Sequence, residues 1–193
     1  MPALTTAQRI RATVGVAVIF GTWFYLVFTR PTDWESVGGS SPALITLGGY
    51  VLGAILLLSA SLPILPARTI AIIPAALVLN IVIGQIVGSV GIPLYLDSVG
   101  TVLVAGLAGP IAGLATGTLS SIVWGLFNPA ALPFAAVSAM VGLLSGVMIA
   151  KGMLRNIPLT ITAGVVLGII SGMLAAPVAA FVYGGTPGGG AGG

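Results

Sequence analysis

The chain has 193 residues, of which 58% are hydrophobic and 5% are charged, with six Lys or Arg against three Asp or Glu. Soluble domains are roughly one quarter charged, and a chain of this length cannot hide so much apolar surface from water, so lipid is the expected solvent. The absence of Cys and His excludes disulfides, a soft metal site, a thiol nucleophile and histidine general acid–base catalysis.

Apolar runs of about 20 residues, the length that crosses the hydrocarbon core, predict membrane-spanning helices along the whole chain. The first covers 13–29, and a polar loop rich in Pro, Gly and Ser follows at 30–42. Between residues 98 and 127 the pattern allows either one long helix or two short helices that turn at Gly109–Pro110. The remaining predicted spans are 43–62, 68–90, 131–150 and 157–183, and the chain closes on the flexible segment GGTPGGGAGG.

The distribution of positive charge decides between one and two helices at 98–127, because cytoplasmic loops collect Lys and Arg. A turn at Gly109–Pro110 places five cations on one side of the membrane, namely Arg9, Arg11, Arg68, Lys151 and Arg155, and leaves only Arg30 on the other. A single crossing would divide the six cations equally. We therefore expect seven spans with the N-terminus in the cytoplasm.

Polar side chains gather near the outer half of the central spans, and polar groups inside a membrane are costly enough to indicate function. The candidate ligand-binding residues are Asn80, Gln85, Tyr95, Asp97, Trp124 and Asn128. Two readings stay open for Asp97, which either caps the short helix that follows it or contacts a ligand. Asn80 and Gln85 are equally open, as interhelical hydrogen-bonding residues or as ligand contacts.

Small residues recur at four-residue spacing, which lets helix backbones approach closely. Examples are Gly109–Gly113–Gly117, Gly142–Gly146 and Gly164–Gly168–Gly172, together with Ala71–Ala75. Packing within this chain is the expected use for most of them. No GxxxxGK[ST] loop is present, so the chain has no ATPase motif of that type.

From about residue 68 onward the sequence resembles the substrate-binding S components of energy-coupling factor (ECF) transporters. The segment "AIIPA" at 71–75 is similar to the AxxxA signature of that family. The segment "IPLYLDSVGTVLVAGLAGPIAGLATG" resembles its first outer loop, short helix and GP-AG turn, and "AAPVAAFVYGGTPGGGAGG" resembles its penultimate helix and the loop that follows. The family core has six helices, whereas this chain matches five of them and adds two N-terminal spans.

The resemblance implies a subunit that captures a vitamin or similar micronutrient from outside and docks on a transmembrane scaffold protein with two cytoplasmic ATPases. Ala71 and Ala75 would contact the scaffold protein, while the six polar and aromatic candidates would line or cover the pocket. The absence of an identifiable buried cation favours a neutral or weakly basic heteroaromatic substrate. No cofactor or metal is expected, and the chain is not expected to be an enzyme.

The predicted fold is therefore an all-α integral membrane bundle of about seven helices, some of them short. Residues 1–66 form a two-span N-terminal extension, and residues 67–193 form an S-component-like domain without its last helix. The alternative function is the membrane sensor domain of a signalling protein that binds a small ligand.

Overall fold

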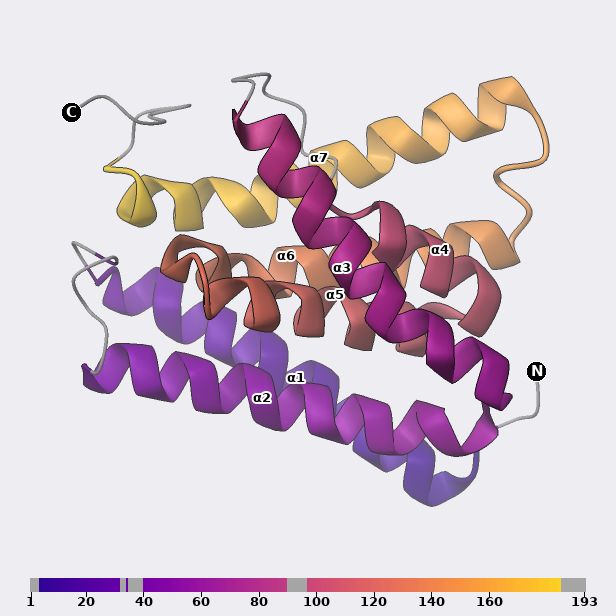
Figure 1. The fold of residues 1–193 in the computed structure, drawn as a ribbon, viewed down its shortest axis with the longest axis horizontal. Coiled ribbons are helices and arrows are strands. Elements are labelled where there is room, and N and C mark those ends of the chain that lie inside the picture. Colours follow the sequence, from indigo (N-terminus) through magenta and orange to yellow (C-terminus); the bar gives the residue numbers. More distant parts are fainter. Residues whose placement is uncertain (1–3, 32–33, 35–39, 90–96, 185–193) are drawn as a thin grey trace.

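The computed structural model describes residues 4–31, 34, 40–89 and 97–184, and every regular element in these ranges is helical. The α-helices are α1 (Thr6–Thr29), α2 (Ser41–Ser61), α3 (Ala67–Ser89), α4 (Val99–Ala108), α5 (Pro110–Gly125), α6 (Ala135–Ala150) and α7 (Ile157–Val182). Two 3₁₀ helices, η2 (Leu62–Ile64) and η3 (Pro129–Phe134), complete the described part (Figure 1). Five helical segments are long and apolar enough to cross a membrane, which makes this a membrane protein by length and composition.

The predicted break at Gly109–Pro110 is confirmed. Gly109 separates α4 from α5 with φ 86°, a conformation that favours glycine because it has no Cβ. Pro110 then begins α5, where a missing N–H removes no helical hydrogen bond. The two halves are short, with 10 residues in α4 and 16 in α5, and neither is among the five long spans.

Helix α5 lies at the centre of the bundle. The glycines at four-residue spacing on α5 and α6 explain how closely these two helices approach each other. A Cβ at Gly117 would clash with the backbone of Ser138, and a Cβ at Gly142 would clash with the backbone of Gly113. A Cβ at Gly146 would lie 2.6 Å from Pro110 Cα. The expected close packing of small residues is therefore confirmed between α5 and α6, where backbones touch directly.

Helices α1 and α2 form a hairpin that packs on α5 and shares a hydrophobic core with it (Figure 1). Ile19, Tyr50 and Leu57 from the hairpin are fully buried in the same cluster as Leu114 of α5. The Tyr50 hydroxyl donates a hydrogen bond to the Pro133 carbonyl of η3 at 3.3 Å. The hairpin thus shares one packed core with α5, α6 and the end of α7, whereas α3 and α4 pack in a second cluster around Ile73 and Val104.

Two tryptophan side chains also form hydrogen bonds between segments that are distant in the sequence, toward the end of the bundle opposite the N-terminus. Trp34 is 3% exposed, and its Nε1–H donates to the Pro129 carbonyl at 2.8 Å. Trp23 Nε1–H donates to the Leu174 carbonyl of α7 at 3.1 Å. These two bonds connect α1 and the loop after it to segments about a hundred residues or more further along the chain.

Helix α7 is loosely attached, and its first half runs away from the other helices (Figure 1). Only Ala163, Val178 and Phe181 are buried in it. Apart from neighbouring residues of α7 itself, no described atom lies within 4 Å of a Cβ built on Gly164, Gly168 or Gly172. Packing within the chain was expected for most of the small-residue series, and this one is an exception in the described part, because its glycines face outward.

Candidate ligand-binding site

Asn80 on α3 is the centre of a buried polar junction between three helices. Its side chain is completely buried, and its Nδ2 donates to Thr101 Oγ1 on α4 at 2.8 Å and to Ser120 Oγ on α5 at 3.2 Å. Its Oδ1 accepts from the Gly100 backbone N–H at 2.6 Å. Both amide protons and one lone pair of the carbonyl oxygen are engaged, so Asn80 connects α3 to α4 and α5.

The same junction explains how α4 begins. The first N–H groups of a helix have no partner within it, and Ser98, the N-cap residue, makes no side-chain capping bond. Asn80 Oδ1 takes the Gly100 N–H instead, so the cap comes from a neighbouring helix. The reading of Asp97 as the cap is therefore wrong, because Asp97 lies one residue before the N-cap.

Asp97 packs beside Trp124 over the small residue Gly84. A Cβ at Gly84 would lie 2.7 Å from Trp124 Cη2 and 3.0 Å from Asp97 Cβ, so both side chains rest on this position of α3. The Ser98 hydroxyl donates to Asp97 Oδ1 at 3.4 Å. Gly84 thus provides the space in which a carboxyl group and an indole ring lie close together.

Burial raises the pKa of the Asp97 carboxyl above its ordinary value, because removal from water disfavours the charged form. Hydrogen bonds from its own backbone N–H and from Ser98 lower the pKa, but they are the smaller effects. A carboxyl group in this setting can accept a hydrogen bond or, when protonated, donate one. Beside the Trp124 ring, it offers polar recognition next to an aromatic surface.

The structure brings together three of the six predicted ligand-binding residues, namely Asn80, Asp97 and Trp124. Gln85 is exposed on α3, and Asn128 is exposed at the start of η3, where its Oδ1 accepts from the Ala130 N–H at 3.2 Å. Tyr95 lies outside the described residues. Ala71 and Ala75 are both exposed on α3, as a surface for a partner requires.

The sequence reading did not select Thr101 or Gly84 as parts of this site. Thr101 is fully buried, and a polar residue near the start of an otherwise apolar helix was the available signal. Gly84 belongs to the small-residue spacing of α3, but nothing local indicates which side chain fills the space beside it. Both roles depend on how α4 and α5 cross α3.

Two cavities of the described part lie away from these residues. One, of about 190 Å³, lies between the start of α2, the end of α5 and η3, and is lined by Trp34, Ala43, Leu44, Leu47, Gly125, Pro129 and Leu132. This is less than the roughly 300 Å³ of the smallest usual ligand pockets. The other, of about 450 Å³, lies at the N-terminus of α3.

Comparison of the chain with protein-family models, with curated proteins and with solved structures finds no match.

Proposed function

We propose that the protein is the substrate-binding membrane subunit of an ECF-type importer in a bacterial plasma membrane. The observation that carries the proposal is that α3 contributes to two different sites along its length. Near its start this helix presents Ala71 and Ala75 on its surface. Further along, it holds the polar junction at Asn80 and then Gly84, against which Asp97 and Trp124 pack. One helix therefore joins a surface for a partner to a candidate ligand site.

The exposed face of α3 suits a helix of a scaffold protein. Ala71 and Ala75 are followed on the surface by Val78 and Val82, which are 61% and 48% exposed. Alanine lets a second helix backbone come close, and neither alanine nor valine has a polar group that must be removed from solvent. The partners in this proposal are a transmembrane scaffold protein and two cytoplasmic ATPases.

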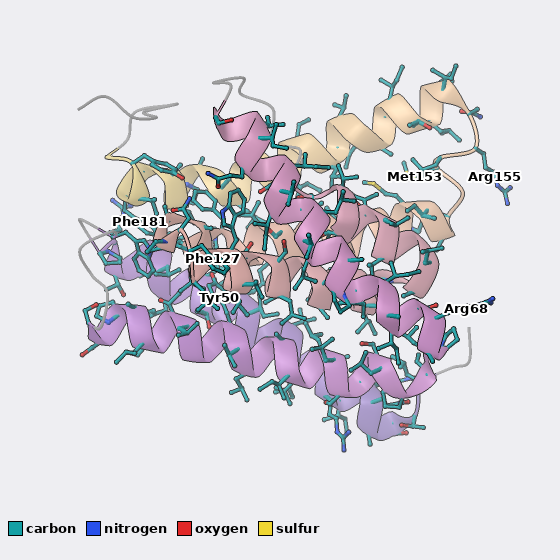
Figure 2. The ribbon with its side chains drawn as sticks, in the orientation of Figure 1. Tyr50, Arg68, Phe127, Met153, Arg155 and Phe181 are labelled. Atoms are coloured by element: carbon teal, nitrogen blue, oxygen red, sulfur yellow. The ribbon has the colours of Figure 1, made fainter. Side chains whose placement is uncertain are left out.

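The orientation in the membrane follows from the cations. Arg68 and Arg155 lie at the same end of the bundle, which is also the end where α1 begins (Figure 2). This end faces the cytoplasm under the positive-inside rule. The opposite end, toward which α5 runs to Trp124, then faces outside and receives the ligand.

The ligand class follows from Asp97 and Trp124. An indole ring supports stacking, and a carboxyl group with a raised pKa provides a hydrogen-bonding partner. A vitamin-like molecule with a neutral or weakly basic heteroaromatic ring matches both groups. Tight binding of a dicarboxylate to the purified protein would contradict this assignment.

Co-purification from native membranes tests the function. We expect wild-type protein to bring down a scaffold protein and two ATPases, and Ala71→Trp or Ala75→Trp to reduce their recovery at least tenfold because the bulky ring separates the helices. Ala17→Trp, at an exposed position on α1, is the matched control and should leave recovery unchanged.

Equal recovery from the Ala71, Ala75 and Ala17 variants would refute the docking surface. Recovery of a kinase or cyclase with the wild-type protein, in place of the ATPases, would refute the transporter and support a sensor.

A further inference from the structure

The cavity at the start of α3 combines an apolar wall with polar groups at one edge. Its volume is about 450 Å³, within the usual range for ligand pockets of roughly 300–1,000 Å³. It lies between η2, α3 and α4, and its lining residues are Ile64, Leu65, Pro66, Arg68, Thr69, Ile72 and Leu107. Five of these seven side chains are apolar, so the cavity suits a ligand that is itself mostly apolar.

Two polar side chains in this lining have no partner among the described residues. Thr69 is only 8% exposed, yet its hydroxyl makes no hydrogen bond with the described part of the chain. Arg68 is exposed and forms no ion pair with a described residue. The Thr69 side chain lines the cavity, and its hydroxyl is not among the buried polar atoms that lack a partner, so it remains accessible to a group bound there. It follows directly after Arg68, a cation that has no counter-ion among the described residues.

The backbone adds to the positive character of this edge. The helical hydrogen bonds of α3 begin with Thr69 N–H and Ile70 N–H, which both donate to the Pro66 carbonyl at 2.8 and 3.2 Å. The N–H groups of Ala67 and Arg68 come before these bonds and lie at the positive end of the helix dipole. A helix N-terminus, a guanidinium group and an unpaired hydroxyl together attract an oxyanion, above all a phosphate.

The position of the cavity in the bundle indicates that the phosphate belongs to a membrane lipid. Arg68 is at the end of the molecule that also carries Arg155 and the start of α1 (Figure 2). Basic pockets between membrane helices at a cytoplasmic surface bind anionic lipid headgroups. The apolar residues Ile72 and Leu107 continue the cavity from this edge along α3 and α4, in the direction an acyl chain would take.

We propose that this cavity binds an anionic phospholipid, with its phosphate at Arg68, the Thr69 hydroxyl and the first N–H groups of α3, and with an acyl chain along Ile72 and Leu107. The bound lipid fills the space between η2, α3 and α4. This site is separate from the ligand site at Asp97 and does not depend on the transport function.

Native mass spectrometry of the full chain, delipidated in detergent, tests the proposal. Short-chain phosphatidylglycerol, short-chain phosphatidylcholine and inorganic phosphate are the three probes. We expect the wild type to retain phosphatidylglycerol about tenfold more strongly than phosphatidylcholine, and Arg68→Gln to weaken phosphatidylglycerol binding about tenfold, the effect of one charge-assisted hydrogen bond. Thr69→Val, which preserves shape, should weaken it severalfold.

Arg155→Gln is the matched control, because Arg155 is an exposed cation at the same end and does not line the cavity. Equal retention of phosphatidylglycerol by the Arg68→Gln and Arg155→Gln variants would overturn the site. If Arg68→Gln does not fold, the site is tested by the weaker phosphatidylglycerol binding expected of Thr69→Val and by the preference of the wild type for phosphatidylglycerol over phosphatidylcholine. Equal binding of the two lipids, or retention of inorganic phosphate as strong as that of phosphatidylglycerol, would overturn the anionic-lipid assignment.

Discussion

Replacement of Asn80 by Ala tests whether this residue joins helices or contacts a ligand. The substitution removes the hydrogen bonds to Thr101 and Ser120 and leaves the buried Gly100 N–H without its acceptor. An unsatisfied buried backbone N–H costs about 1–3 kcal/mol. Interhelical side-chain bonds in membrane proteins contribute about 0.6 kcal/mol each. We therefore expect Asn80→Ala to lower the free energy of unfolding by roughly 2–4 kcal/mol.

Reversible unfolding in mixed detergent micelles, followed by circular dichroism, gives this free energy directly. Thr101→Val removes one of the three bonds and should cost about 0.6–1.7 kcal/mol. Gln85→Ala, on the exposed face of the same helix, is the control and should stay within about 0.5 kcal/mol of wild type. The reasoning is refuted if Asn80→Ala unfolds like Gln85→Ala. Loss of ligand binding by a fully stable Asn80→Ala protein would instead make Asn80 a ligand contact.

Two further predictions concern glycine packing and the Asp97 carboxyl. Gly142→Ala places a methyl group against the Gly113 backbone and should destabilise the protein by about 1–3 kcal/mol, whereas Gly168→Ala, with open space around it, should be neutral or stabilise by up to about 1 kcal/mol. Thermal unfolding of both variants in one detergent checks this, and equal melting temperatures would contradict the close approach of α5 and α6. Because burial raises the pKa of Asp97, its contribution to stability is fully present below the ordinary pKa of 3.8 and is lost as the pH rises through the folded-state pKa. Asp97→Asn should therefore melt above wild type at neutral pH, and the difference should shrink as the pH falls toward 4; a difference that grows on acidification would be the wrong sign.

The positions of the long helices were accessible from the local apolar pattern. Long apolar runs predict spans because only helices satisfy their own backbone hydrogen bonds in lipid, and α2, α3 and α7 begin and end within two residues of the predicted limits. The first helix is longer than predicted, since its polar first turns also form a helix, capped at Thr5. The predicted span at 131–150 divides into η3 and α6, because the prolines at 129 and 133 favour a tighter turn there.

The candidate site was only partly accessible, because each role depends on which side chain meets another across helices. Polar residues in apolar spans are visible in the sequence, and Asn80, Asp97 and Trp124 do lie in one region of the bundle. Nothing local shows that Asn80 caps α4, nor that Gly84 receives the Trp124 ring. Helix faces are set by periodicity, but the partner of each face is set by crossing angles and by long-range packing.

Composition, apolar run length and the Gly109–Pro110 turn were enough to establish a helical membrane protein with five cations expected on one side, since these features act within one segment at a time. Tertiary structure decided which repeated glycines touch. Gly113 and Gly142 meet at a backbone contact, whereas Gly164 and Gly168 face outward, although all four stand in the same spacing. It also decided that Asn80 makes hydrogen bonds to two other helices. The side chains of Thr69 and Arg68 have no such partner among the described residues. A hydrogen bond between helices requires both partners in place, and only the folded chain determines where the second partner lies.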